Sequence, residues 1–211
     1  MPAVIRNDVV RYSARVIPWL PPLAAAVVAT VVIAVRHGQG GAFPLQIAAL
    51  LLASGIGYAL DDPAFEVLAA SPTSYRRRRL QRLSIVLPPT VVLYAALLVW
   101  QGTAGPEETL AFVAMATGLM GMAVGIAGVA SRRSPRGLGG IAVAPALFAA
   151  LILSTMLPPR WRPLPIGDIP GGWLPIYLRW SAAALVGVLV LAVSSRDRAG
   201  RIGPDGTSRS Q

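Results

Sequence analysis

Six apolar runs, each close to the length of a membrane-crossing helix, limit what this chain can fold into. They cover residues 17–35, 43–60, 84–100, 109–130, 138–157 and 174–193. A helix needs about 20 apolar residues to cross the hydrocarbon layer, and it pairs all its backbone polar groups internally. A mean hydropathy of +0.61 and a charged fraction of 13% exclude an ordinary soluble domain. We therefore predict an all-α integral membrane protein with six transmembrane helices.

The basic residues gather between these runs and predict the orientation of the chain. All 19 are arginine, which is typical of a GC-rich genome. With the N-terminus inside, fifteen of them fall on the cytoplasmic side and four on the other. Cytoplasmic segments carry the excess of Arg and Lys, so both termini are predicted to be cytoplasmic. The net charge of +10 then reflects orientation in a membrane and not nucleic-acid binding. The location we expect is a bacterial plasma membrane.

The two ends of the chain differ from the apolar runs. Before the first run, apolar residues alternate with arginines, and Arg11 and Arg15 are one helical turn apart. This pattern predicts an N-terminal amphipathic helix in the headgroup layer. A signal peptide is the competing interpretation, and we reject it because further spans follow and no clear small-x-small cleavage site is present. Residues 1–195 are predicted to form one membrane domain, and the polar residues 196–211 a disordered cytoplasmic tail.

The connection between the second and third runs, residues 60–83, is the longest internal polar stretch. Asp62 before Pro63 predicts the start of a short helix, with Asp as N-cap and Pro at the first position. Glu66 lies one turn further on the same side. Ser71 before Pro72 ends this helix and can cap the next, because Pro disfavours helical geometry at the residue before it. A basic stretch, including four consecutive arginines, then precedes the third run. An ordinary positive-inside loop would explain the arginines alone.

The order of residues 61–79 resembles the coupling segment of type-2 ATP-binding-cassette (ABC) exporter permeases. In that family an acidic residue is followed by a leucine-rich turn, a small residue, Pro, Val or Thr, Ser and a basic stretch. Here the centre reads Ser71-Pro72-Thr73-Ser74, and Pro63-Ala64-Phe65 replaces the usual Gly-Thr. The family's segment also lies between spans two and three. The resemblance implies a short cytoplasmic coupling helix whose ATPase-contacting residues are Asp61, Asp62, Glu66, Leu68, Ser71, Pro72, Thr73, Tyr75 and Arg76.

The resemblance implies a permease subunit that acts with a separate ATPase. The chain has no Lys, so it cannot contain the Gly-x-x-x-x-Gly-Lys-Ser/Thr phosphate loop and should not hydrolyse ATP itself. ATP and Mg would be bound by the partner ATPase, and this chain would need no cofactor or metal of its own. A second permease copy, giving a homodimer, and membrane lipids are the other expected partners, with no nucleic acid. The expected substrate is hydrophobic or amphiphilic, such as an antibiotic, a lipid or a peptide.

Two other functions remain open. A small integral-membrane lipid enzyme could hold a divalent metal at Asp61 and Asp62, although Glu66 is the only further carboxylate nearby. A non-catalytic membrane assembly factor is the other alternative. The chain has no Cys and a single His, His37, which excludes thiolate metal sites and chemistry that needs a His pair. No confident Asp, Glu, Lys, Arg or His falls in the interior of a predicted span, which argues against a proton relay.

Three further patterns concern the shape and packing of the membrane segments. The fourth run carries Gly118, Gly121, Gly125 and Gly128, and such small residues let helix backbones approach closely. We favour packing inside one subunit over a subunit interface for these glycines. Two consecutive prolines, Pro88 and Pro89, predict a kink in the third span. The outer connection at residues 158–172 is rich in Pro and Gly, and part of it is predicted to dip back into the membrane edge.

Overall fold

The structure is a computed structural model that describes residues 17–37, 42–61, 75–102, 105–134, 138–158 and 174–194. All regular elements in these ranges are helical, as the sequence predicts. They are α2 (Leu20–Arg36), α3 (Phe43–Ala59), α4 (Tyr75–Gln101), α5 (Pro106–Arg133), the short 3-10 helix η2 (Gly140–Ala142), α6 (Val143–Thr155) and α7 (Leu174–Ser194). The predicted amphipathic helix, the re-entrant loop and the C-terminal tail lie outside the described residues, as do residues 62–74 of the long connection.

Three of these helices are long and apolar enough to cross a membrane, namely Arg77–Gln101 within α4, α5 and α7. The other three, α2, α3 and Gly140–Thr155, are shorter and equally apolar. A helix of 17 residues, such as α3, is about 25 Å long at about 1.5 Å per residue, a little less than a typical hydrocarbon layer. The structure therefore supports a helical membrane protein, and six complete crossings remain a prediction.

The ends of α5 follow helix electrostatics. Pro106 takes a first-turn position, where its missing N–H costs nothing, and Glu107 and Glu108 lie beside the positive end of the helix dipole. Arg132 and Arg133 occupy the last turn, at the negative end. The charges that flank the fourth apolar run therefore extend the helix beyond the predicted 109–130 at both ends.

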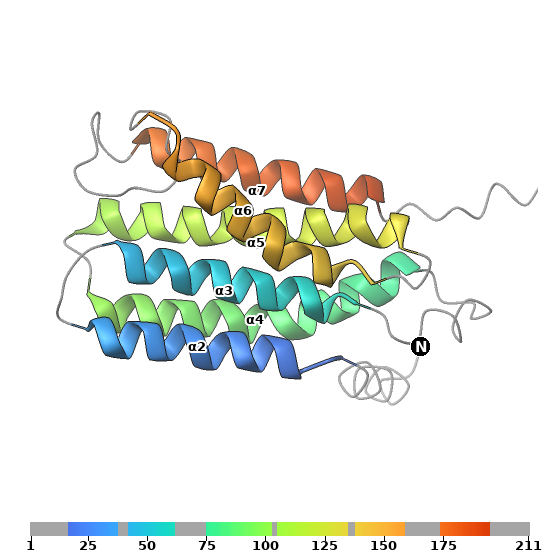
Figure 1. Cartoon of the computed structure of the whole chain (residues 1–211), viewed down its shortest axis with the longest axis horizontal. Helices are drawn as coiled ribbons and strands as arrows, with labels where there is room; N and C mark the ends of the chain where they lie inside the picture. The colour runs from blue at the N-terminus through green and yellow to red at the C-terminus, as the bar shows by residue number, and fades with distance from the viewer. Residues whose placement is uncertain are drawn as a thin grey trace, which may run out of the picture.

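Helix α4 begins at Tyr75, nine residues before the predicted span at 84–100. Arginine is a good helix former, so the basic stretch continues the helix instead of ending it. Pro88 and Pro89 lie inside α4. Each lacks the N–H that would bond to the preceding turn, and α4 changes direction between its blue-green N-terminal part and the green remainder (Figure 1).

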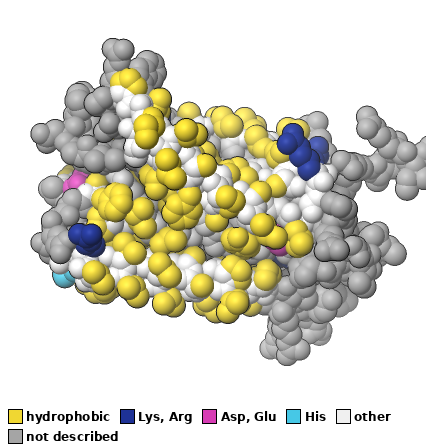
Figure 2. Space-filling view, in the orientation of Figure 1, with side chains coloured by type: hydrophobic (Ala, Val, Ile, Leu, Met, Phe, Trp, Pro, Cys, Tyr) yellow, Lys and Arg dark blue, Asp and Glu magenta, His cyan; other side chains and the backbone are white. Residues whose placement is uncertain are grey.

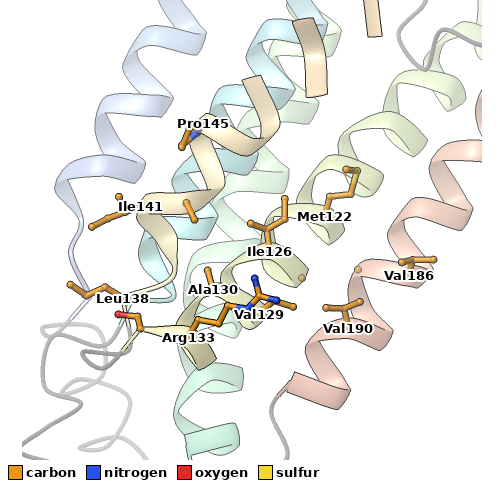
Figure 3. Close-up of a pocket in the computed structure, with 14 residues that line it drawn as sticks. Met122, Ile126, Val129, Ala130, Arg133, Leu138, Ile141, Pro145, Val186 and Val190 are labelled. Carbon is orange, nitrogen blue, oxygen red and sulfur yellow. The ribbon is translucent and has the colours of Figure 1, made fainter. Parts of the chain in front are cut away.

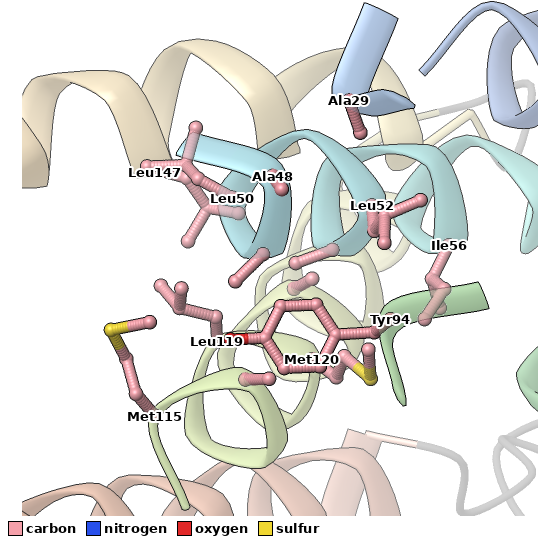
Figure 4. Packing of buried hydrophobic residues seen from close by; sticks show 14 of the residues in the cluster. Ala29, Ala48, Leu50, Leu52, Ile56, Tyr94, Met115, Leu119, Met120 and Leu147 are labelled. Carbon is pink, nitrogen blue, oxygen red and sulfur yellow. The ribbon is translucent and has the colours of Figure 1, made fainter. Parts of the chain in front are cut away.

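Helix α3 is the centre of the bundle. It packs against α2, α4, α5, η2 and α6, while α7 packs along α5 (Figure 1). Most of α3 is buried, on every side of the helix, as expected of a helix that is apolar all round. Leu50 and Ile56 of α3 face Leu119 of α5 and Tyr94 of α4 in the core (Figure 4). The Tyr94 hydroxyl donates to the Phe112 carbonyl at 3.4 Å, so this polar group is satisfied between α4 and α5.

The outer surface is apolar over the length of the bundle. Hydrophobic side chains cover the face seen in Figure 2, and charged side chains lie towards its two ends. Exposed residues include Leu20 of α2, Val99 of α4 and Leu185 of α7, with 81%, 80% and 61% of their surface accessible. A soluble monomer rarely exposes an apolar surface of this extent, and lipid is the environment that such a surface requires.

The predicted topology can be tested with reporter fusions. Because the arginine bias predicts that both termini are inside, successive connections should alternate between outside and inside. The fusion sites, beginning outside, are Gly40, Ser74, Gly105, Ser134, Gly167 and Ser208. Full activity of a cytoplasmic reporter is expected at the second, fourth and sixth sites and little at the others. A reporter that is inactive at Ser74, and therefore outside, would contradict both the predicted topology and the predicted cytoplasmic coupling segment.

Candidate functional site: a polar cluster at the base of the long connection

A group of buried polar side chains and backbone amides lies at the end of the bundle where α3 ends and α4 begins. We call it the polar cluster, and it comprises Asp61, Arg79, Arg82, Ser131, Gly139 and Gly140. Its residues come from the end of α3, the start of α4, the end of α5 and the residues that lead into α6. Two consecutive pairs of helices, α3 with α4 and α5 with α6, therefore meet at this one end of the bundle.

Asp61 caps the start of η2 and α6 from another part of the chain. Its Oδ1 accepts the backbone N–H groups of Gly139 at 2.7 Å and of Gly140 at 2.6 Å. The first N–H groups of a helix have no partner within the helix, and the positive end of the helix dipole favours a negative charge. A Cβ on Gly140 would meet the Gly57 carbonyl oxygen at 2.6 Å and Asp61 Oδ2 at 2.8 Å. Glycine is therefore required here for α6 to start this close to α3.

Arg79 and Arg82 bind backbone and hydroxyl oxygens from the other helices. Arg82 donates from Nη1 to the backbone carbonyl of Asp61. Arg79 donates from Nη2 to the Ala127 carbonyl at 3.0 Å and to the Ser131 hydroxyl. Both arginines are at least 95% buried. Charge-assisted hydrogen bonds of this kind are stronger than neutral ones, so α4 is fastened to the ends of α3 and α5.

The charge state of Asp61 is set mainly by burial. Removal of the carboxylate from water raises the pKa of Asp61 above its ordinary value of 3.8. The amides of Gly140 and Gly139 and the charges of Arg79 and Arg82 oppose this rise. These four opposing effects do not outweigh burial, so the carboxylate is harder to ionise here than in water.

The glycines of the fourth run lie along the contact between α5 and α7. A Cβ on Gly121 would meet the backbone of Ala184 at 2.9 Å, and one on Gly125 would meet Gly187 Cα at 3.2 Å. Gly118 lies against Trp180 in the same way, and Gly128 lies against Ser194. These distances leave no room for side chains, so the two backbones touch along about three turns within one chain.

Arg132 closes the same contact at its basic end. Its Nε donates to the Ser194 carbonyl at 2.6 Å, and its Nη2 to the Val193 carbonyl at 2.5 Å. The last carbonyls of a helix lack intrahelical partners, and a nearby cation stabilises them. The end of α7 is thereby fixed to the end of α5, next to the polar cluster.

The structure describes three of the predicted ATPase-coupling residues, one of them with its side chain and two by their backbone alone. Asp61 is buried, and its carboxylate binds the chain's own backbone. Tyr75 and Arg76 form the first turn of α4, and their side chains lie outside the described residues. The remaining six lie outside the described residues altogether, namely Asp62, Glu66, Leu68, Ser71, Pro72 and Thr73. Contact with an ATPase remains a prediction for all nine.

The sequence did not indicate the internal roles of the basic stretch. From the sequence this stretch is predicted to be part of the cytoplasmic connection, yet Arg79 and Arg82 are buried and Arg78 is half-buried, whereas Arg77 is exposed. Residues 79 and 82 are three apart, so they share one face of the helix that begins at Tyr75. The three-residue spacing could have indicated a shared, buried face. It does so only if residues 79 and 82 are helical, and the predicted span begins at residue 84. Nothing in the sequence pairs Asp61 with Gly139 and Gly140.

No cluster of three or more His, Cys, Asp or Glu side chains that could hold a metal occurs among the described residues. Asp62 and Glu66, which the lipid-enzyme alternative requires beside Asp61, lie outside that part of the chain. Comparison with protein-family models, with curated proteins and with solved structures finds no match to this chain. The function must therefore be argued from the residues and from the geometry of the bundle.

Proposed function

We propose that this chain is the membrane-spanning subunit of a type-2 ABC exporter, driven by a separate ATPase that docks on residues 62–74. The observation that carries the proposal is the polar cluster. The described residues on either side of this segment are Asp61 and Tyr75; Asp61 belongs to the cluster, and Tyr75 begins α4 one turn before Arg79.

This attachment supports a coupling role because it transmits force. A load on residues 62–74 acts on α3 through Asp61 and on α4 directly. The bonds from Asp61 to Gly139 and Gly140 pass the load to α6, and those from Arg79 to Ala127 and Ser131 pass it to α5. Packed helices and strong hydrogen bonds move as rigid bodies and not as independent loops. Movement of one short segment would then tilt four helices together.

The charges of the described helices favour an external source of energy. Glu107 and Glu108 begin α5, and the basic residues of α4 and α7 lie within about two turns of the helix starts. The remaining charges end their helices, namely Arg36 of α2 and Arg132 and Arg133 of α5. Proton-driven transporters place ionisable groups near the middle of the membrane. Two copies of the chain would form the translocation path between them, with apolar walls suited to a hydrophobic or amphiphilic substrate.

Leu68→Asp tests whether residues 62–74 bind an ATPase. If Leu68 inserts into a groove of the partner, a charge there would be desolvated without a counter-ion, and most of the ATPase should be lost on co-purification. Glu66→Ala should lose less, because ion pairs at a solvated rim contribute only about 0–1 kcal/mol. Arg77→Gln, on the exposed side of α4, is the control and should retain the ATPase.

The measurement is the amount of ATPase subunit retained per permease, beside the monodispersity of each variant. ATP hydrolysis should be absent from the purified chain and appear with the partner. Full retention by monodisperse Leu68→Asp would remove the main support for the exporter. Robust ATP hydrolysis by this chain alone would contradict the proposal directly. A preparation that never yields an ATPase would leave the lipid enzyme or the assembly factor as the better interpretation.

A further inference from the structure

An open groove of about 990 Å³ runs between α5, α6 and α7 at the basic end of the bundle. Helices α6 and α7 each pack on α5, but they diverge from one another towards this end (Figure 1). Ile126 and Val129 of α5 form the floor. Ile141 of η2 lines one side and Val190 of α7 lines the other (Figure 3). The groove therefore opens on the apolar outer surface, where lipid chains would lie.

One charged side chain lies at the end of this apolar groove. Arg133, in the last turn of α5, lines it and is exposed, and its guanidinium points along the floor beside Val129 (Figure 3). The described part of the chain provides no hydrogen bond or ion pair for Arg133. Its neighbour Arg132 differs, because its guanidinium is bound to the end of α7. Ser134 also lines this end of the groove and adds a hydroxyl group.

We propose that this groove binds one anionic phospholipid, with an acyl chain between α6 and α7 and the headgroup phosphate on Arg133. The occupant follows from the lining. Apolar walls open to the bilayer fit an acyl chain, and Arg133, the one cation that the described residues place at this end of the groove, fits a phosphate, which Arg binds in a bidentate manner. The arginine bias places this end at the cytoplasmic leaflet, where anionic lipids are concentrated.

Native mass spectrometry of the purified full-length chain tests this site. Phosphatidylglycerol and phosphatidylcholine with identical acyl chains are titrated separately, and the fraction of protein that retains one lipid is measured. The unmodified chain should retain phosphatidylglycerol about tenfold more tightly than phosphatidylcholine, the difference expected from one charge-assisted contact. Arg133→Gln should remove that preference. Arg77→Gln, which deletes an exposed charge at the same end, should keep it.

A second variant tests the apolar part of the site independently. Ala142 of η2 is exposed and lines the groove, so Ala142→Trp fills the space without altering charge. This variant should bind both phosphatidylglycerol and phosphatidylcholine more weakly. Excess inorganic phosphate should not displace either lipid from the unmodified chain. An unchanged lipid preference in Arg133→Gln, or an equal loss in Arg77→Gln, would overturn the proposal.

Two other outcomes would also overturn it. Unaltered binding to Ala142→Trp would mean that the lipids lie elsewhere on the surface. A protein dimer that Ala142→Trp dissociates, with no lipid retained, would identify the groove as an interface between copies. The measurement uses this chain without any ATPase, so a negative result leaves the exporter proposal unaffected.

Discussion

Asp61→Ala should destabilise the folded protein by about 1–3 kcal/mol for each buried N–H group that it leaves without an acceptor. The substitution leaves the N–H groups of Gly139 and Gly140 without an acceptor and removes the carboxylate from beside Arg79 and Arg82. Asp61→Asn keeps an acceptor oxygen and has no charge to bury, so it should lose much less. The measurement is the free energy of unfolding in one detergent, with monodispersity as the control for insertion.

The pH dependence gives an independent check of the same cluster. Because burial raises the pKa of Asp61, the folded protein holds this proton at higher pH than the unfolded chain does. The resulting stabilisation is complete below the unfolded pKa, near 3.8, and is lost as the pH rises through the folded pKa. Asp61→Asn should lack this decline. Equal stability of the Ala and Asn variants, with pH profiles that match the unmodified chain, would show that Asp61 does not anchor α6.

Gly187→Leu should separate α7 from α5 and cost about 3 kcal/mol, the upper part of the range for overpacking a close contact. A Cβ at this position would meet the Gly121 carbonyl oxygen and Gly121 Cα, the latter at 2.9 Å. Backbone atoms cannot rotate away as a side chain can, so the helices themselves must move. The main contact of α7 is with α5, so no other neighbour compensates. The midpoint of thermal unfolding should fall clearly.

Gly105→Ala is the matched control for this variant. Gly105 precedes α5, has an extended backbone, and has open space around the position of a Cβ. Its substitution should leave the unfolding midpoint almost unchanged. If Gly187→Leu unfolds at the same temperature as Gly105→Ala, the close contact between α5 and α7 is not a source of stability. The same result together with loss of a dimer that the unmodified chain forms would move these glycines to a subunit interface.

The positions of the helices follow from the sequence because they depend on local properties. Apolar runs of membrane-spanning length must become helices in lipid, and the expected runs at 43–60 and 174–193 agree closely with α3 and α7. Charged residues near helix ends were predicted poorly, because arginine both marks a membrane surface and continues a helix. For this reason α4 begins nine residues early. The predicted span at 138–157 is also divided, into η2 and α6, and it contains no charged residue that would have indicated this.

By itself the sequence determined an all-helical, membrane-compatible chain whose arginines lie between apolar runs. The tertiary structure alone decided which of these arginines are internal. Arg79 and Arg77 have the same chemistry and neighbouring positions, yet one bonds to α5 and the other is exposed. Likewise, only the packing of α6 against the end of α3 brings Gly139 within 2.7 Å of Asp61. A contact between residues 78 positions apart depends on the path of every helix between them, and no local pattern in the sequence encodes that path.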